Sequence, residues 1–192
     1  MQKSENALIA RICHDMITPI NAISLGFEAF EISGDRSLFK EIRESADKAN
    51  VILKFIRELY SEKSNAFCYS LQSLNQLIID FLKKYNISFQ LTSSLENIPN
   101  IAGKIIMYNA IVTKEIMPFG GAVNAKIDDN SAEILTICHG KNVSLPNLST
   151  DCEFNSKNIM RISLLQLLKE SGFKIIAYRE ESQLIIREQM IV

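Results

Sequence analysis

The stretch "RICHDMITPINAI", residues 11–23, combines helical periodicity with the pair His14-Asp15 and, five residues after the histidine, Pro19. It belongs to a longer pattern in which apolar residues recur every three or four positions, as they do along one face of an α-helix. The sequence therefore predicts a helix over about residues 9–30, with an apolar stripe made of Ile9, Ile12, Met16, Ile20, Ile23, Phe27 and Phe30.

A second helix is predicted directly after the first. The segment "SGDRS", residues 33–37, supplies turn and N-cap residues. So short a connection makes the two helices an antiparallel hairpin. Such a hairpin leaves one apolar flank uncovered, and a four-helix bundle is the usual way to bury it, so we expect a homodimer through residues about 7–62. The second stripe consists of Leu38, Ile42, Ala46, Ala49, Leu53, Ile56 and Tyr60.

The pattern of apolar and polar residues changes after "SEKSNA", residues 61–66. Helical patterns now alternate with alternating apolar and polar runs that are typical of strands. The sequence thus predicts an α+β protein, with a helical hairpin over residues 1–64 and an α/β domain over 65–192. Expected helices lie near 70–84, 101–117 and 157–171, and expected strands near 86–91, 122–127, 132–138, 173–179 and 183–188.

Composition narrows the class of protein. With 47% hydrophobic and 22% charged residues among 192, the chain can bury a core. Its net charge of -1 argues against nucleic-acid binding, which usually needs a basic surplus. No apolar run is long enough for a membrane span, and the first residues lack the apolar core of a signal peptide. We expect a cytoplasmic protein whose four cysteines, Cys13, Cys68, Cys138 and Cys152, are reduced thiols.

His14 faces away from the expected core. At about 100° per residue, it lies about 165° from the centre of the first apolar stripe. Pro19 lacks the N–H that would bond the Asp15 carbonyl, so it disturbs the turn that carries His14. Arg11, Thr18, Asn21 and Leu25 share the face of His14.

This arrangement suggests nucleophilic chemistry. A neutral, exposed imidazole offers one ring nitrogen as a nucleophile. A carboxylate at the other nitrogen would fix the tautomer and stabilise the charge that develops during attack. Asp15 is the candidate, although adjacent helix positions do not face each other, so its side chain must turn towards His14. Thr18, one turn further on, can reach a group bound over His14.

The run "HDMITP", residues 14–19, resembles the phospho-acceptor box of two-component histidine kinases, written His-Asp/Glu-x-x-Thr/Asn-Pro. In those kinases, as predicted for this chain, the box lies on the first helix of a helical hairpin. Together with "ADKANVILKFIRELYS", residues 46–61, and the following α+β region, the whole chain resembles the ChpT-type histidine phosphotransferases of alphaproteobacteria. That family implies a dimeric four-helix bundle and a small α/β sandwich related to the kinase ATPase (Bergerat-like) domain that no longer binds ATP.

The resemblance implies a relay. His14 would carry a phosphoryl group from the receiver domain of a hybrid histidine kinase to response regulators, with Asp15 and Thr18 assisting. No cofactor is expected on this chain, because the receiver would hold the Mg²⁺. Kinase–receiver complexes suggest a docking face below His14, and the antiparallel hairpin adds a polar flank of the second helix. The expected partner-binding residues are Arg11, Ile17, Asn21, Leu25, Lys54 and Arg57.

Two other functions are open to the same hairpin: an ATP-using kinase fragment, and a noncatalytic dimeric scaffold that binds response regulators. Phosphate-binding loops need closely spaced glycines, and the sequence has no Gly-x-Gly and no Gly-Lys-Ser/Thr. Kinase ATPase domains carry an Asn-x-x-x-Asn helix, whereas "KIIMYNAIVTKEIMPFGG", residues 104–121, offers only Asn109, with Ile105 at the first position. The sequence therefore predicts no ATP binding.

Overall fold

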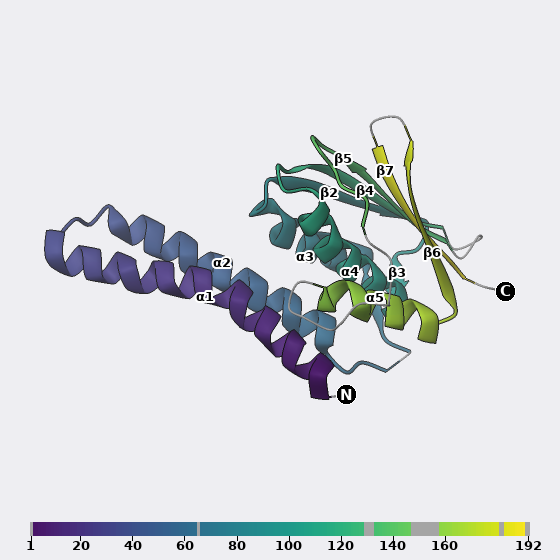
Figure 1. Ribbon diagram of the computed structural model, residues 1–192, viewed down its shortest axis with the longest axis horizontal. Coiled ribbons are helices and arrows are strands. Elements are labelled where there is room, and N and C mark those ends of the chain that lie inside the picture. Colours follow the sequence, from purple (N-terminus) through teal and green to yellow (C-terminus); the bar gives the residue numbers. More distant parts are fainter. Residues whose placement is uncertain (1, 65, 129–132, 147–157, 181–182, 191–192) are drawn as a thin grey trace. The chain divides into compact units, whose positions relative to one another are not determined.

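The computed structural model describes residues 2–64, 66–128, 133–146, 158–180 and 183–190. The chain divides into two compact units, one built around a hairpin of two helices and the other around a five-stranded sheet. The hairpin consists of α1 (Gln2–Ser33) and α2 (Leu38–Tyr60), shown in purple and blue in Figure 1. The predicted hairpin is confirmed.

The turn of the hairpin depends on local hydrogen bonds. Gly34 adopts a φ of 66°, a left-handed conformation that glycine reaches without strain, and its N–H donates to the Phe30 carbonyl at 2.7 Å. The Asp35 side chain accepts from the backbone N–H of Ser37 at 2.8 Å. These contacts end α1 and start α2 within four residues, as the turn residues of the sequence predict.

Two contacts set the register of the hairpin. The rings of Phe30 and Phe39 lie 4.6 Å apart between centroids. A Cβ added to Gly26 would come within 2.6 Å of Ile42, so glycine permits close approach of α1 and α2 there. Because both helices rise by about 1.5 Å per residue, these contacts place position 54 of α2 level with His14.

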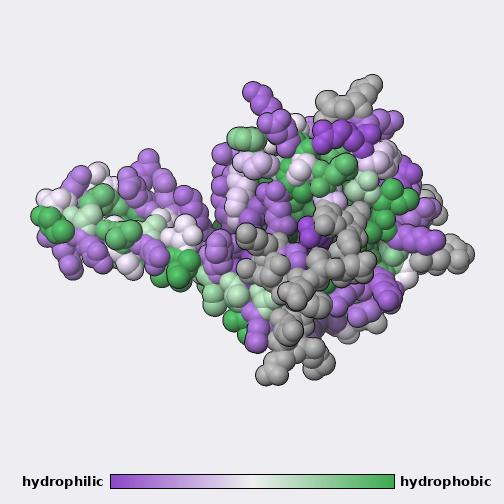
Figure 2. All heavy atoms as spheres, in the orientation of Figure 1, coloured by the Kyte–Doolittle hydropathy of each residue, from purple (hydrophilic) through white to green (hydrophobic). Residues whose placement is uncertain are grey.

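The first apolar stripe is only partly covered by α2. Ile9, Ile20 and Phe27 keep exposed fractions of 59%, 48% and 46%. A single neighbouring helix covers a narrow band, so the remainder of the stripe stays on the surface of this chain. Figure 2 shows apolar side chains in green among hydrophilic ones along the hairpin.

The second unit contains a sheet in the order β2-β4-β5-β7-β6. Strand β2 (Ile87–Ser93) pairs in parallel with β4 (Gly121–Asp128), and all other neighbours are antiparallel. The other strands are β5 (Glu133–His139), β6 (Phe173–Glu180) and β7 (Gln183–Met190). Figure 1 shows α3 (Leu71–Lys83), α4 (Asn100–Ile116) and α5 (Ile159–Glu170) along one face of this sheet.

Alternation along the strands supplies the core of this unit. In β2, β4 and β5 every second residue is buried, because successive strand residues point to opposite faces of the sheet. The buried positions include Phe89 and Leu91 of β2, Val123 and Ala125 of β4, and Ile134 of β5. The predicted three helices and five strands are all present; the expected helix start at 157 and strand start at 132 lie outside the described residues.

The sequence did not predict one small sheet. Strand β1 (Cys68–Ser70) pairs with β3 (Asn97–Pro99), and each has three residues. Runs this short show no reliable alternation, which explains why they were missed. Among the described residues, no helix is long and apolar enough to cross a membrane.

Candidate functional site

His14 lies on the surface of α1. Its side chain is 75% exposed, so the ring can be reached by another molecule. The prediction from the helical wheel that His14 faces away from the packed side of α1 is therefore confirmed.

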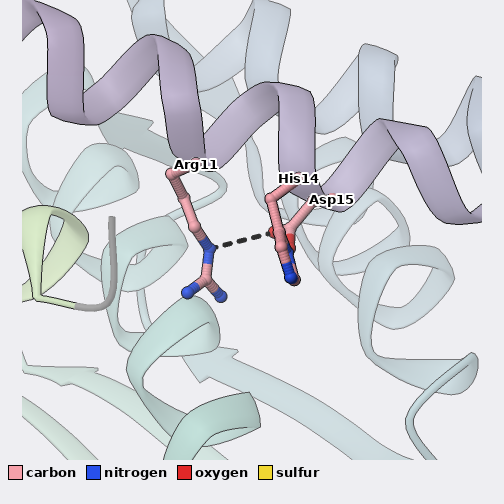
Figure 3. Close-up of polar contacts among 3 residues, drawn as sticks. All are labelled: Arg11, His14 and Asp15. Carbon is pink, nitrogen blue, oxygen red and sulfur yellow. Dashed lines mark hydrogen bonds and ion pairs between the residues drawn. The ribbon is translucent and has the colours of Figure 1, made fainter. Parts of the chain in front are cut away.

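Asp15 turns towards His14 despite being its neighbour in the helix. Its Oδ1 lies 3.3 Å from Nδ1 of the imidazole. Its Oδ2 lies 3.3 Å from Nε of Arg11, one turn earlier on the same helix. Figure 3 shows the three side chains converging on this carboxylate. The carboxylate thus has one oxygen on the imidazole and the other on a guanidinium.

The turn after His14 holds Thr18 and Pro19. Thr18 is exposed and lies four residues after His14, on the same side of the helix. Helix α1 continues on both sides of Pro19, which is buried. Since proline has no N–H, Pro19 cannot donate the usual helical hydrogen bond to the Asp15 carbonyl. Pro19 therefore interrupts the helical hydrogen bonding next to His14, the candidate nucleophile.

The other expected partner-binding residues are exposed on the two helices of the hairpin. Ile17 and Leu25 are apolar yet 55% and 62% exposed, and Asn21 is exposed as well. Lys54 and Arg57 are exposed on α2, and the register of the hairpin places Lys54 level with His14. A surface with both exposed apolar groups and cations is suited to docking another protein.

Arg11 makes a contact that the sequence analysis did not include. Its expected contact with a partner stays a prediction, and within the chain it forms an ion pair with Asp15. The spacing of four residues, which brings opposite charges together on a helix, is the signal that could have predicted this pair.

In the second unit, Asn109 and the pair Gly120-Gly121 contribute to packing. Asn109 is 2% exposed and donates from its side-chain amide to Oγ1 of Thr136 at 3.1 Å, inside the core. Gly120 and Gly121 have positive φ values of 76° and 146°, and a Cβ on either would meet the backbone carbonyl of Asn86 or His139 within 2.4 Å. These glycines serve close approach of the backbone, and the buried amide of Asn109 faces away from solvent.

A carboxylic acid lies beside Asn109. Glu188 of β7 is fully buried, and burial raises its pKa from 4.5 to about 8. Neither carboxyl oxygen has a partner of normal hydrogen-bonding geometry among the described residues, although the nearby Asn109 amide lowers the pKa somewhat. Burial and the charge of Glu188 raise the pKa of the neighbouring Cys138 thiol to about 11. The described part of the chain contains no cluster of three metal-ligating side chains.

A helical hairpin followed by a five-stranded sheet that helices cover on one face is the architecture of histidine kinases. The fold is similar to that of the Acinetobacter baumannii histidine kinase AdeS, with a TM-score of 0.50 and 10% identity over 92% of this chain and 96% of that one. No protein-family model matches the sequence.

Two phosphotransferases resemble the chain over most of its length. "Protein phosphotransferase ChpT" of Brucella abortus (strain 2308) is 21% identical over 180 residues, which cover 88% of this chain and 86% of the relative. The solved structure of a bacterial phosphotransferase matches with a TM-score of 0.84 and 19% identity, over 97% of this chain and 95% of that one. Sequence and fold agree on a ChpT-type protein, and the resemblance drawn from the sequence is confirmed.

Proposed function

We propose that this chain is a histidine phosphotransferase that relays a phosphoryl group between receiver domains through His14. The likeness to phosphotransferases in sequence and in fold supports the general function. The observation that carries the choice of His14 is its 75% exposed ring held against the Asp15 carboxylate. The donor is the receiver domain of a hybrid histidine kinase, and the acceptors are response regulators.

The proposed transfer has a simple electron balance. The lone pair of His14 Nε2 forms a bond to phosphorus, while the bond from phosphorus to the receiver's aspartate oxygen breaks and its electrons stay on that carboxylate. Positive charge develops on the imidazole, where the Asp15 carboxylate, 3.3 Å from Nδ1, stabilises it. Thr18 hydrogen-bonds the phosphoryl group from the next turn. The receiver supplies the Mg²⁺, and the chain itself uses no cofactor.

Docking of the receiver would use the face around His14. Ile17 and Leu25 offer apolar contact area, and Asn21 offers an amide beside them. Lys54 and Arg57 give this part of the hairpin positive charge, which suits the acidic phosphorylation site of a receiver. These features support docking at the middle of the hairpin.

A homodimer through the hairpin is part of the proposal. Ile9, Ile20 and Phe27 form a band of exposed apolar groups along α1, and Leu53 of α2 is 49% exposed. A second hairpin packed against this band would complete a four-helix bundle. In light scattering we expect a dimer for the native chain and a monomer for Ile20→Asp. A native chain that is monomeric at micromolar concentration would contradict this part of the proposal.

A cytoplasmic location is also proposed, with which the free thiols of Cys13, Cys68 and Cys138 are compatible.

Phosphoryl transfer from a labelled receiver tests the function. Incubation with phosphorylated receiver domains should label the native chain with an acid-labile, base-stable adduct. His14→Ala should abolish the label without loss of helix content, and the matched control His139→Ala should keep it, since the chain has two histidines. Label retained in His14→Ala, or lost only in His139→Ala, would overturn the assignment.

The buried amide of Asn109 argues against the kinase alternative, because this residue would have to leave the core to meet a nucleotide. The scaffold alternative predicts that His14→Ala binds receivers and retains full signalling activity. The labelling experiment therefore separates the relay from the scaffold, and a titration with Mg-ATP separates the relay from the kinase.

A further inference from the structure

Arg11 and His14 contact the same carboxylate from opposite sides. Nε of Arg11 lies 3.3 Å from Oδ2 of Asp15, and Nδ1 of His14 lies 3.3 Å from Oδ1 (Figure 3). All three residues belong to α1, so their spacing along one helix brings these side chains together. The Asp15 carboxylate therefore links Arg11 to the imidazole of His14.

The helix geometry explains why Asp15 needs a second contact. Residues 14 and 15 are adjacent, and adjacent side chains of a helix diverge by about 100°. An aspartate at this position has rotamers that point away from the imidazole, towards solvent. Arg11 stands four residues earlier, at the spacing that brings opposite charges together. Its bond to Oδ2 favours the rotamer that presents Oδ1 to the ring.

The charge of Arg11 also affects the proton on His14. A cation beside a carboxylate favours its ionised form. An ionised Asp15 accepts a hydrogen bond from Nδ1–H of the imidazole, and the guanidinium opposes transfer of that proton to the carboxylate. The proton therefore stays on Nδ1, and the lone pair that attacks phosphorus stays on Nε2.

We infer that Arg11 is a positioning residue for phosphoryl transfer: it holds the Asp15 carboxylate in the orientation that keeps the proton of His14 on Nδ1 and the nucleophilic lone pair on Nε2. The inference rests on the proposed role of His14 and assigns to Arg11 a function within the chain instead of a direct contact with the receiver. Once phosphorylated on Nε2, the ring keeps its Nδ1 proton and remains a good leaving group, so the same contact serves transfer in both directions.

Nitrogen NMR of the histidine side chains tests this without any phosphoryl transfer. In ¹⁵N-labelled native protein at a pH where the ring is neutral, His14 should be mainly in the Nδ1–H tautomer; its signals are those that disappear in His14→Ala. Arg11→Gln should raise the share of the Nε2–H tautomer several-fold. The matched control Arg43→Gln removes an exposed arginine of α2 and should leave the tautomers unchanged. An unchanged tautomer ratio in Arg11→Gln would overturn the inference.

The rate of phosphoryl transfer to His14 provides a second test of the role of Arg11. Arg11→Gln should slow phosphorylation of His14 by about tenfold, the rate equivalent of one charge-assisted hydrogen bond. In an Asp15→Asn background the same change should have little further effect, because Arg11 acts through Asp15. An equal loss in both backgrounds would mean that Arg11 contacts the receiver directly, and would overturn the inference. A native chain that takes no label on His14 would refute the proposed function instead, and the tautomer measurement would still stand.

If Arg11→Gln does not fold, Arg11→Lys serves the same purpose. Lysine keeps the charge but lacks the planar Nε–H donor, so it should restore only part of the tautomer preference. A native tautomer ratio together with a tenfold loss of rate in Arg11→Lys would contradict the positioning role.

Discussion

Replacing Glu188 with glutamine should make the α/β unit more stable at high pH. The carboxyl group of Glu188 is fully buried beside Asn109, on the core face of β7. It pairs across the sheet with Ile134 on one side and Ile175 on the other, so its neighbours there cannot solvate a charge. Glutamine has almost the same shape and carries no charge at any pH.

The magnitude follows from the raised pKa. Burial shifts the pKa of Glu188 from 4.5 in an exposed chain to about 8 in the fold. Between these pH values the unfolded chain has released the proton and the folded chain still holds it, so the free energy of unfolding falls as pH rises. At about 1.4 kcal/mol per pH unit, the loss reaches at most about 5 kcal/mol at pH 8 and then stops growing. In the Glu188→Gln variant no carboxyl group is present at this position, so the free energy of unfolding does not show this loss.

Urea unfolding of the full chain at pH 5, 6, 7 and 8 measures the effect. Four of the five tyrosines lie in the α/β unit, so tyrosine fluorescence reports on it. We expect the stability difference between Glu188→Gln and the native chain to be small at pH 5 and to widen steadily to pH 8. Glu180→Gln, at an exposed position of β6, should show a constant difference. A constant difference for Glu188→Gln would contradict this prediction, because it would mean that the carboxyl group is already solvated in the fold.

Three further predictions concern packing, nucleotide binding and docking. Gly103→Ala should destabilise the α/β unit by about 1–3 kcal/mol in urea, since its Cβ would lie 2.4 Å from the Tyr69 ring; unchanged stability would contradict that contact. Calorimetric titration with Mg-ATP should be flat, because the Asn109 amide is buried, and a clear isotherm would favour the kinase alternative. Leu25→Asp and Lys54→Glu should each slow transfer at limiting receiver, with a stronger salt dependence for the lysine variant; normal rates in both would move the docking face elsewhere.

Local patterns were sufficient to predict the hairpin and the exposure of His14 on it. Helical period, the glycine at position 34 and the capping residues act over a few positions, so they are readable without the fold. The exposure of His14 followed from the wheel for the same reason. The wheel could not show how far α2 would cover the stripe of α1, because that depends on the register and distance of two helices.

The α/β unit was predicted as a set of elements, and its arrangement was not. Alternation identifies strands, but the order β2-β4-β5-β7-β6 depends on pairing between segments far apart in the sequence. The run "QLIIREQM" has apolar residues on both faces, so it does not reveal that Glu188 points into the core. Only the packed sheet brings Glu188 next to Asn109 and turns that amide towards Thr136.

By itself, the sequence determined which residues form the hairpin and that His14 faces outward, because helical periodicity and turn chemistry are local properties of the chain. Tertiary structure alone decided what lies inside the α/β unit, since burial is a property of elements packed together. It also showed that the Asp15 carboxylate is shared between Arg11 and His14, because a side-chain rotamer depends on all of its neighbours and not on sequence spacing alone.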